Sequence, residues 1–171
     1  MPDVELPVLS RPFDELVPGD RFETRGRTLT EADVVAFSAL TGDWHPQHSD
    51  REWAARSPFG RRIAHGLLVM SCAAGMVPFD PEHVVALRRV GAVFKSPVAF
   101  GDTISVRGKV ERVAPIDDVV GLVECVWTVR NQDARTVLRA NVEVLWRRAA
   151  APAAVGVTGP DVAWTGGVIP C

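Results

Sequence analysis

The sequence is poor in the features that would tie it to a membrane, to nucleic acid or to an oxidising compartment. No apolar run approaches the roughly 20 residues that a membrane-spanning helix needs. The first residues lack the basic segment and the long apolar stretch of a signal peptide. Nineteen basic residues face 21 acidic ones, for a formal net charge of −2, so no basic excess indicates nucleic acid or a membrane surface. These absences predict a cytoplasmic protein with neither kind of partner.

Cysteine is also scarce, and its placement is irregular. The three cysteines, Cys72, Cys125 and Cys171, are odd in number and have no CxxC spacing. This pattern favours reduced thiols over disulfides or a zinc site. We interpret Cys72 and Cys125 as small core residues, which is the usual place of a free cysteine.

What the chain does contain is enough apolar material for one sizeable core. It has 171 residues, of which 47% are hydrophobic and 23% charged, and this length fits a single domain. Residues 1–20 are rich in proline and acid and predict an irregular lead-in. Residues 149–171 carry little regular patterning and predict an extended tail in which Trp164 and Ile169 could pack. The domain itself is therefore expected to span residues 1–148.

Helical signals occupy the first half of the chain, after a weakly alternating strand near 21–28. Thr30 with Asp33 forms a capping box for a helix that Gly42 is well placed to end. A short helix is expected after Ser49 or Asp50. Residues 65–77, "HGLLVMSCAAGMV", are apolar on nearly every side, which predicts a buried helix that other elements wrap.

From about residue 84 the hydrophobic period changes to two. Four long strands are predicted at 84–96, 102–113, 119–131 and 135–148, with a hairpin turn at "NQDA". One antiparallel sheet curved around one long apolar helix satisfies both patterns, whereas a sandwich would leave the helix unexplained. The predicted fold class is therefore α+β, an antiparallel β-sheet wrapped around a long central α-helix.

The chemistry concentrates in "GDWHPQH", residues 42–48, which holds two of the four histidines. Asp43 and His48 would point about 140° apart on a helix, but a loop bent by Pro46 can bring them together. A carboxylate and an imidazole facing one water make a workable proton-transfer pair. The alternative is that Asp43 caps the next turn and that His48 is a solvated loop residue.

The dipeptide His65-Gly66 adds a second feature. If the buried helix begins here, its first N–H groups have no partner within the helix and carry the positive end of its dipole. Gly66 has no side chain, so a thioester carbonyl could approach its N–H and receive stabilisation as an enolate. Equally, the glycine could serve only to let the helix and the sheet pack closely.

These residues also carry a resemblance. "LTEADVVAFSALTGDWHPQHSDREWAARSPFGRRIAHGLL", residues 29–68, resembles the signature segment of MaoC-like (R)-specific enoyl-CoA hydratases, and "FKSPVAFGDTISV", residues 94–106, resembles a turn between sheet strands of that family. The likeness extends over roughly residues 13–147. It implies a hot-dog fold, normally a homodimer, with active sites between the subunits.

The resemblance also implies an activity and a set of site residues. Asp43 and His48 match the catalytic pair of the family and Gly66 its oxyanion donor. In the implied reaction Asp43 takes a proton from water, and His48 holds that water and supplies a proton to the α-carbon. The substrate would be a trans-2-enoyl thioester of CoA or of a carrier protein, the product an (R)-3-hydroxyacyl thioester, and no metal or other cofactor would be needed. Candidate substrate-binding residues are Trp44, His45, Phe59 and His65.

One departure from the family and several rival functions remain open at this stage. The family usually has Asn where this chain has His45, which indicates a possible second titrating group or a specialised substrate. The rival functions are a specialised biosynthetic dehydratase, a hot-dog acyl thioesterase and a non-catalytic acyl-binding subunit. Lys95, with Arg88 and Arg89, could meet the phosphates of CoA, but alternating basic residues on a strand are typical of a solvated face.

Overall fold

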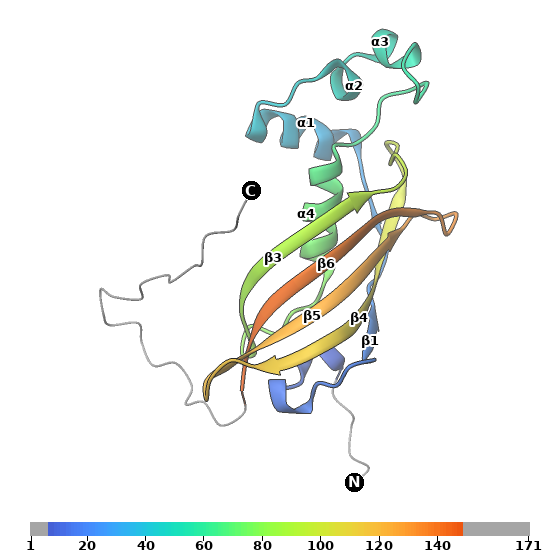
Figure 1. The fold of residues 1–171 in the computed structure, drawn as a ribbon. Helices are drawn as coiled ribbons and strands as arrows, with labels where there is room; N and C mark the ends of the chain where they lie inside the picture. Colours follow the sequence, from blue (N-terminus) through green and yellow to red (C-terminus); the bar gives the residue numbers. More distant parts are fainter. Residues whose placement is uncertain (1–6, 149–171) are drawn as a thin grey trace, which may run out of the picture.

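The molecule is built from a curved antiparallel sheet with a helix lying against one of its faces (Figure 1). This computed structural model describes residues 7–148, so the predicted tail at 149–171 lies outside the described residues. The strand order is β1-β4-β5-β6-β3, and β2 pairs with β4. The strands are β1 (Arg21–Glu23), β2 (Arg27–Thr28), β3 (Val84–Phe94), β4 (Thr103–Pro115), β5 (Val120–Arg130) and β6 (Thr136–Arg147). The predicted α+β class and the four long strands are confirmed.

The core lies between the sheet and the helix α4 (Gly66–Met76). Along β4 the alternation of apolar and polar residues places Ile104, Val106 and Val110 inward with no exposed surface. Trp127 and Trp146 are also fully buried. The prediction that other elements cover α4 on every side is wrong among residues 7–148: Leu67 is 65% exposed, and Ser71 and Gly75 are exposed as well. These three residues are four positions apart, so they form one uncovered stripe along α4.

The first described residues pack against the end of the sheet. Two short 3-10 turns, η1 (Val8–Ser10) and η2 (Phe13–Glu15), bury Leu9 and Phe13. The ring of Phe13 lies so close to β5 that a Cβ at Gly121 would meet it at 2.0 Å. The indole Nε1 of Trp146 donates to the backbone oxygen of Arg11 at 2.9 Å, which ties the lead-in to the last strand.

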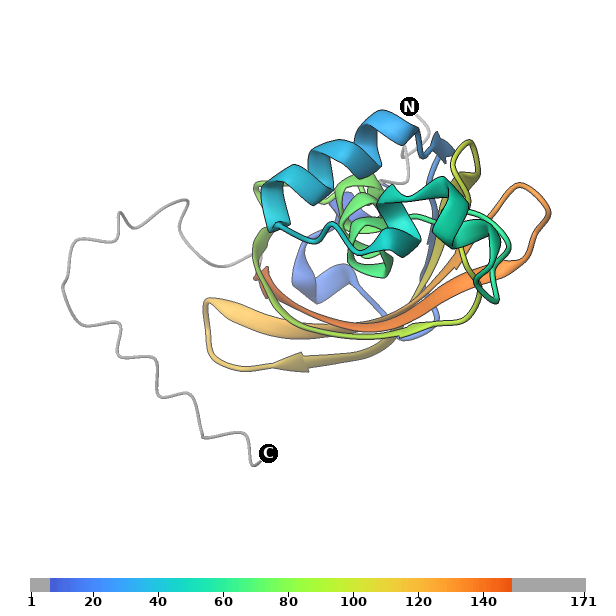
Figure 2. The ribbon, with the colours of Figure 1, turned by 90° about the horizontal axis from the view of Figure 1, so that it is seen from above.

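Helix α1 (Glu31–Thr41) begins and ends where the sequence predicts. The backbone N–H of Asp33 donates to Thr30 Oγ1 at 3.2 Å, and the backbone N–H of Thr30 donates to Asp33 Oδ2 at 2.8 Å, which is a complete capping box. Gly42 takes the left-handed conformation, with φ 77°, as its C-cap. Viewed from above, α4 lies between α1 and the sheet (Figure 2).

The segment after Gly42 is more ordered than the predicted loop. Pro46–Ser49 form a single helical turn, α2, with Pro46 at its first position, where a missing N–H costs no hydrogen bond. His45 caps this turn. The short helix α3 (Arg51–Ala55) follows, and Asp50 caps it through a hydrogen bond from the Trp53 N–H at 2.9 Å, as predicted.

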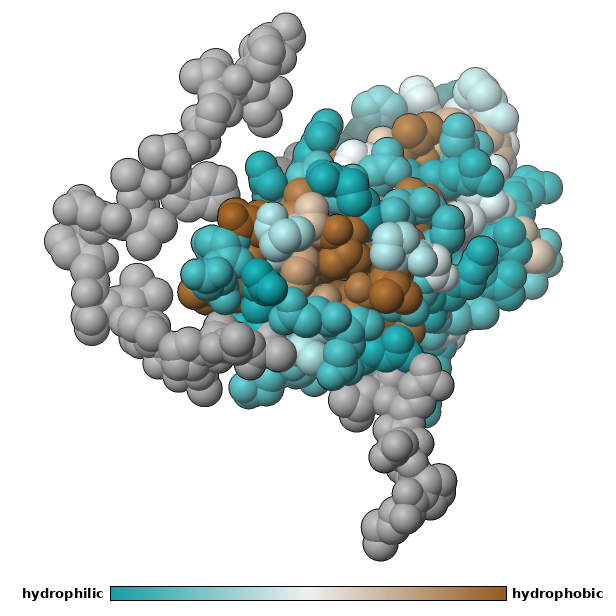
Figure 3. Space-filling view, turned by 60° about the horizontal axis from the view of Figure 1, so that its bottom comes forward, coloured by the Kyte–Doolittle hydropathy of each residue, from teal (hydrophilic) through white to brown (hydrophobic). Residues whose placement is uncertain are grey.

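Strand β3 closes one side of the sheet and has no second neighbouring strand among residues 7–148. Five of its large apolar side chains are 38–54% exposed; they are Val85, Leu87, Val90, Val93 and Phe94. Figure 3 shows that apolar side chains gather in the middle of one face of the molecule and are ringed by hydrophilic ones. Within the described range no helix is both long and apolar enough to span a membrane.

Candidate active site

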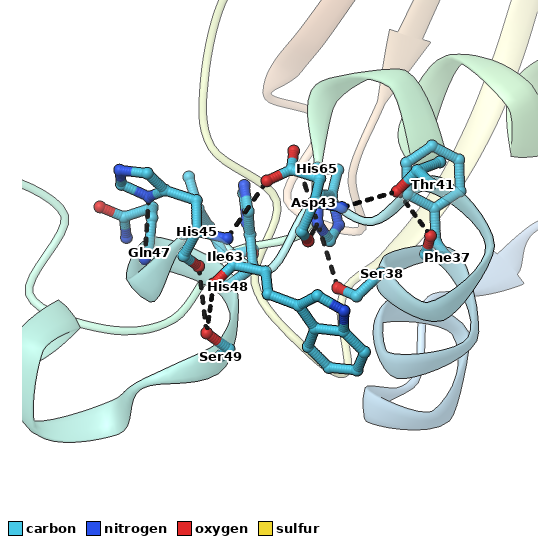
Figure 4. A network of polar contacts seen from close by, with 11 residues as sticks. Phe37, Ser38, Thr41, Asp43, His45, Gln47, His48, Ser49, Ile63 and His65 are labelled. Atoms are coloured by element: carbon cyan, nitrogen blue, oxygen red, sulfur yellow. Dashed lines mark hydrogen bonds and ion pairs between the residues drawn. The ribbon is translucent and has the colours of Figure 1, made fainter.

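The structure brings Asp43 and His48 together with a third residue, His65. One ring nitrogen of each histidine and one carboxylate oxygen of Asp43 lie within 4.8 Å of one another (Figure 4). Asp43 directly follows the C-cap of α1, His48 lies on α2, and His65 precedes α4. The reversal of the chain at Gly42 and the turn that starts at Pro46 bring the carboxylate of Asp43 close to the imidazole of His48.

The hydrogen bond of His48 defines its tautomer. Its Nδ1 lies 2.7 Å from the backbone oxygen of Ile63, and a carbonyl can only accept, so Nδ1 carries the proton. In the neutral ring Nε2 then presents a lone pair. Burial lowers the pKa of His48; the hydrogen bond to Ile63 opposes this shift and the neighbouring His65 adds to it. His48 is therefore suited to accept a proton near neutral pH.

The carboxylate of Asp43 is oriented by the backbone around it. The N–H of His45 donates to Asp43 Oδ1 at 3.2 Å. The N–H of Asp43 itself donates to Thr41 Oγ1 at 3.3 Å, and that hydroxyl donates to the backbone oxygen of Phe37 at 2.7 Å. The other carboxylate oxygen, Oδ2, is 3.9 Å from His65 Nε2. The side chain of Asp43 is still 52% exposed, so water has access to it.

His65 is 3% exposed and touches both of these residues. Its Nε2 lies 3.1 Å from the backbone oxygen of Asp43 and 3.3 Å from Ser38 Oγ. Its ring stacks on the ring of His48, with centroids 3.7 Å apart and planes 28° from parallel. Ser38 is a site residue that the sequence reasoning missed. A serine four residues after buried Val34, on the same face of α1, was the signal that could have found it.

Gly66 begins α4, and no side chain caps the first turn of that helix. A Cβ at this position would lie 2.8 Å from the ring of Phe94, at the end of β3, so any other residue here would require that ring to move. This close approach is compatible with an N–H that faces a substrate. The assignment of Gly66 as an oxyanion donor stays a prediction.

A cavity of about 500 Å³ lies over these groups. Among the predicted site residues, Asp43, His48, Phe59, His65 and Gly66 line it. Trp44 and His45 are not part of its lining; Trp44 is half exposed and His45 caps α2, so their substrate contacts stay predictions. The sequence reasoning did not place Phe94 here, and it favoured a solvated face for Lys95, yet both line the cavity.

Among residues 7–148, the same three residues are the group that could hold a metal ion. One nitrogen of each ring already bonds a backbone oxygen, Nδ1 of His48 to Ile63 and Nε2 of His65 to Asp43. Imidazole lone pairs lie in the ring plane, so two stacked rings cannot both aim their remaining nitrogen at one ion. The donor set therefore suits proton transfer better than coordination.

The sequence is similar to bacterial proteins with related names. It is 45% identical over 97 residues to the protein MaoC of Klebsiella aerogenes. It is 36% identical over 106 residues to a 3-hydroxybutyryl-CoA dehydratase of Methylorubrum extorquens and 30% identical over 106 residues to an (R)-specific enoyl-CoA hydratase of Rhodospirillum rubrum. These matches cover 56%, 60% and 60% of this chain, and 29%, 66% and 72% of the respective relatives. The chain thus spans less than a third of the Klebsiella protein.

Solved structures agree with the fold. A protein from Archaeoglobus described as a monoamine oxidase regulatory protein has a TM-score of 0.77 and 35% identity, over 81% of this chain and 95% of that one. A Mycobacterium tuberculosis protein with a double hot-dog fold has a TM-score of 0.73 and 24% identity, over 97% of this chain and 53% of that one, so the hot-dog fold is confirmed. The family model of the MaoC-like domain matches residues 14–130, and the chain therefore belongs to the MaoC-like dehydratase family.

Proposed function

We propose that this protein adds water reversibly to trans-2-enoyl thioesters and gives (R)-3-hydroxyacyl thioesters. One observation carries the proposal: the carboxylate of Asp43 and the imidazole of His48 converge within 4.8 Å on a largely apolar cavity, beside the uncapped start of α4. An acid–imidazole pair moves protons, an apolar cavity accepts an acyl chain, and a helix N-terminus stabilises an oxyanion. The named activities of the Methylorubrum and Rhodospirillum relatives fit this reaction.

In the proposed mechanism one water donates hydrogen bonds to both residues. Its oxygen attacks the β-carbon while one of its protons moves to the pair. The electrons of the double bond pass to the thioester oxygen, which the N–H of Gly66 stabilises as an enolate. The pair then returns one proton to the α-carbon, so the product has gained one water and the enzyme is unchanged.

The tautomer of His48 supports a particular division of labour within the pair. A neutral ring whose Nδ1–H is donated to Ile63 has only a lone pair at Nε2, and its pKa lies below the ordinary value. We therefore assign the first proton transfer to His48 as acceptor, after which the imidazolium supplies the α-carbon. Asp43 orients the water and stabilises the imidazolium. This differs from the sequence-based assignment, in which Asp43 takes the water proton and His48 holds the water and supplies the proton to the α-carbon.

We also propose that the working form is a homodimer joined along β3. An unpaired edge strand is a template for pairing with a second copy, and natural proteins rarely leave a long apolar one open. The exposed side chains of Leu87, Val90 and Phe94 on β3, and of Leu67 on α4, offer the apolar surface that such a contact would bury. Because Phe94 also lines the cavity, the partner would lie beside the substrate.

A paired assay tests the function. Crotonyl-CoA is incubated with the enzyme, and loss of the double bond and release of free thiol are followed in parallel. We expect hydration without thiol release. Thiol release at the faster rate would identify a thioesterase, and no reaction on crotonyl, longer enoyl or carrier-protein thioesters would identify a binding subunit. Assays of the reverse reaction on (R)- and (S)-3-hydroxyacyl thioesters give the stereochemistry.

A further inference from the structure

We infer that His65 is a positioning residue that holds the two proposed catalytic groups in a fixed relation to each other. The inference rests on the proposed function, because it assigns His65 a part in the same site. His65 is the point where the two groups meet: it bonds the backbone of Asp43 and stacks on the ring of His48. His45 also contacts both residues, because its N–H donates to Asp43 Oδ1 and its backbone oxygen accepts from the His48 N–H. It does not, however, hold the ring of His48 in plane as His65 does.

The first contact fixes the position of Asp43. The backbone oxygen of Asp43 can only accept, so the Nε2 of His65 donates to it, at 3.1 Å. Within residues 7–148, no other donor to this oxygen is found. Asp43 lies just beyond α1, after the C-cap Gly42, and its own N–H donates to the hydroxyl of Thr41. Without the imidazole donor, the segment that carries the carboxylate would lose its tie to α4.

The second contact fixes the plane of His48. The rings are 3.7 Å apart at their centroids, which is van der Waals contact, so His48 cannot tilt toward α4. His65 in turn is held by Phe37, whose ring centroid is 5.1 Å away, and by Ser38 Oγ. The hydrogen bond of His48 to Ile63 then fixes the one remaining rotation of the ring. The lone pair of Nε2 is thereby kept in one direction.

The remaining nitrogen explains why His65 positions the site without transferring protons itself. Its Nδ1 is buried and has no hydrogen-bond partner among the described residues. A group that exchanged protons with water or substrate would need a partner at this atom. The chemistry of His65 is therefore confined to the Nε2–H donor and the ring face.

Two substitutions separate these contacts. His65→Phe keeps an aromatic face for His48 and removes the donor to Asp43, whereas His65→Gln keeps an N–H donor and removes the ring. Because a displacement of about 1 Å can cost on the order of a hundredfold, we expect His65→Phe to lower kcat by ~30- to 100-fold with KM changed less than ~3-fold. His65→Gln should regain at least ~10-fold of that loss.

A readout that needs no activity completes the test. The amide of His45 is bonded to Asp43 Oδ1, so its hydrogen exchange reports the order of the Asp43 segment. We expect faster exchange at His45 in His65→Phe, exchange close to wild type in His65→Gln, and no change in the matched controls His83→Phe and His83→Gln, which lie in the loop before β3. Wild-type kcat and unchanged exchange in folded His65→Phe would overturn the inference. If the wild-type protein hydrates no enoyl thioester, the proposed function fails, and the exchange rates alone decide the role of His65.

Discussion

The Nδ1 of His45 accepts the backbone N–H of Gln47 at 3.1 Å and so caps the single-turn helix that carries His48. An asparagine, the usual residue of the family at this position, can accept the same N–H through its side-chain oxygen. The departure from the family pattern is therefore structurally conservative while the ring is neutral. A ring protonated at Nδ1 can no longer accept, and it would also place a positive charge near Asp43 and His48.

His45→Asn should therefore retain activity, because the asparagine oxygen can accept the Gln47 N–H that the imidazole accepts. The measurement is kcat/KM of both proteins on one enoyl thioester. Loss of activity would show that the imidazole has a further role.

Asp43→Asn and His48→Gln should each lower turnover by about a hundredfold or more while the protein stays folded. Each replacement keeps the volume and some hydrogen bonding. His48→Gln removes the group that accepts and returns the proton, and Asp43→Asn removes the negative charge that orients the water and stabilises the imidazolium. Initial rates are compared with the wild type at saturating substrate, and thermal unfolding serves as the control for the fold. A purified variant with more than about a tenth of wild-type activity would refute the role of that residue.

The lowered pKa of His48 also predicts how stability depends on pH. Its ordinary value is 6.5, and in the folded protein burial holds the pKa below that value. As the pH falls past 6.5, the unfolded chain binds a proton before the folded protein does, so this contribution to the free energy of unfolding is lost. Urea unfolding of the wild type and His48→Gln, from about pH 8 to about pH 5, should show a steeper acid loss in the wild type. Parallel curves would contradict this.

A charge on the exposed edge should disrupt the proposed dimer. Val90 is 38% exposed on β3, and Val90→Lys would bring two ammonium groups together in a paired edge. Light scattering should give a dimer for the wild type and a monomer with reduced activity for the variant. Val119→Lys is the matched control, because Val119 is 51% exposed in the turn before β5. A wild-type protein that is fully active as an 18.5 kDa monomer would end the proposal.

Replacing each of two glycines of α4 by alanine should change the free energy of unfolding in opposite directions. At Gly66 a Cβ would meet the Phe94 ring at 2.8 Å, whereas at Gly75 it would meet nothing within 4 Å. We expect Gly66→Ala to destabilise by about 1–3 kcal/mol and to lower activity. Gly75→Ala should stabilise by roughly 0.5–1 kcal/mol, because alanine loses less backbone freedom on folding. Thermal unfolding measures both, and Gly66→Ala combined with Phe94→Leu should regain stability. Equal effects at the two positions would contradict the close approach.

The features that the sequence predicts correctly are those that depend on residues close together in the chain. The capping box of Thr30 and Asp33, the C-cap at Gly42 and the two-residue period of the four long strands each lie within a short window, and each is found in the structure. The hydrogen bond from His65 to the backbone of Asp43 joins residues 22 positions apart, and no local sequence pattern near either residue predicts it. The exposed stripe of α4 was missed for a different reason: the apolar composition of a helix does not tell which of its faces other elements cover.

The strand order has a consequence for how the protein is made. Among residues 7–148 the last strand to be synthesised, β6, lies between β5 and β3 and pairs with both, so β3 cannot join the sheet until residues 136–147 have left the ribosome. Until then α4 can pack on β4, but β3, which carries Phe94 of the pocket, has no strand to pair with. Long-range pairing of this kind is slow to form and exposed to aggregation. We therefore expect a nascent chain stalled before β6 to be a client of chaperones, and completion of β6 to assemble the pocket in a single step.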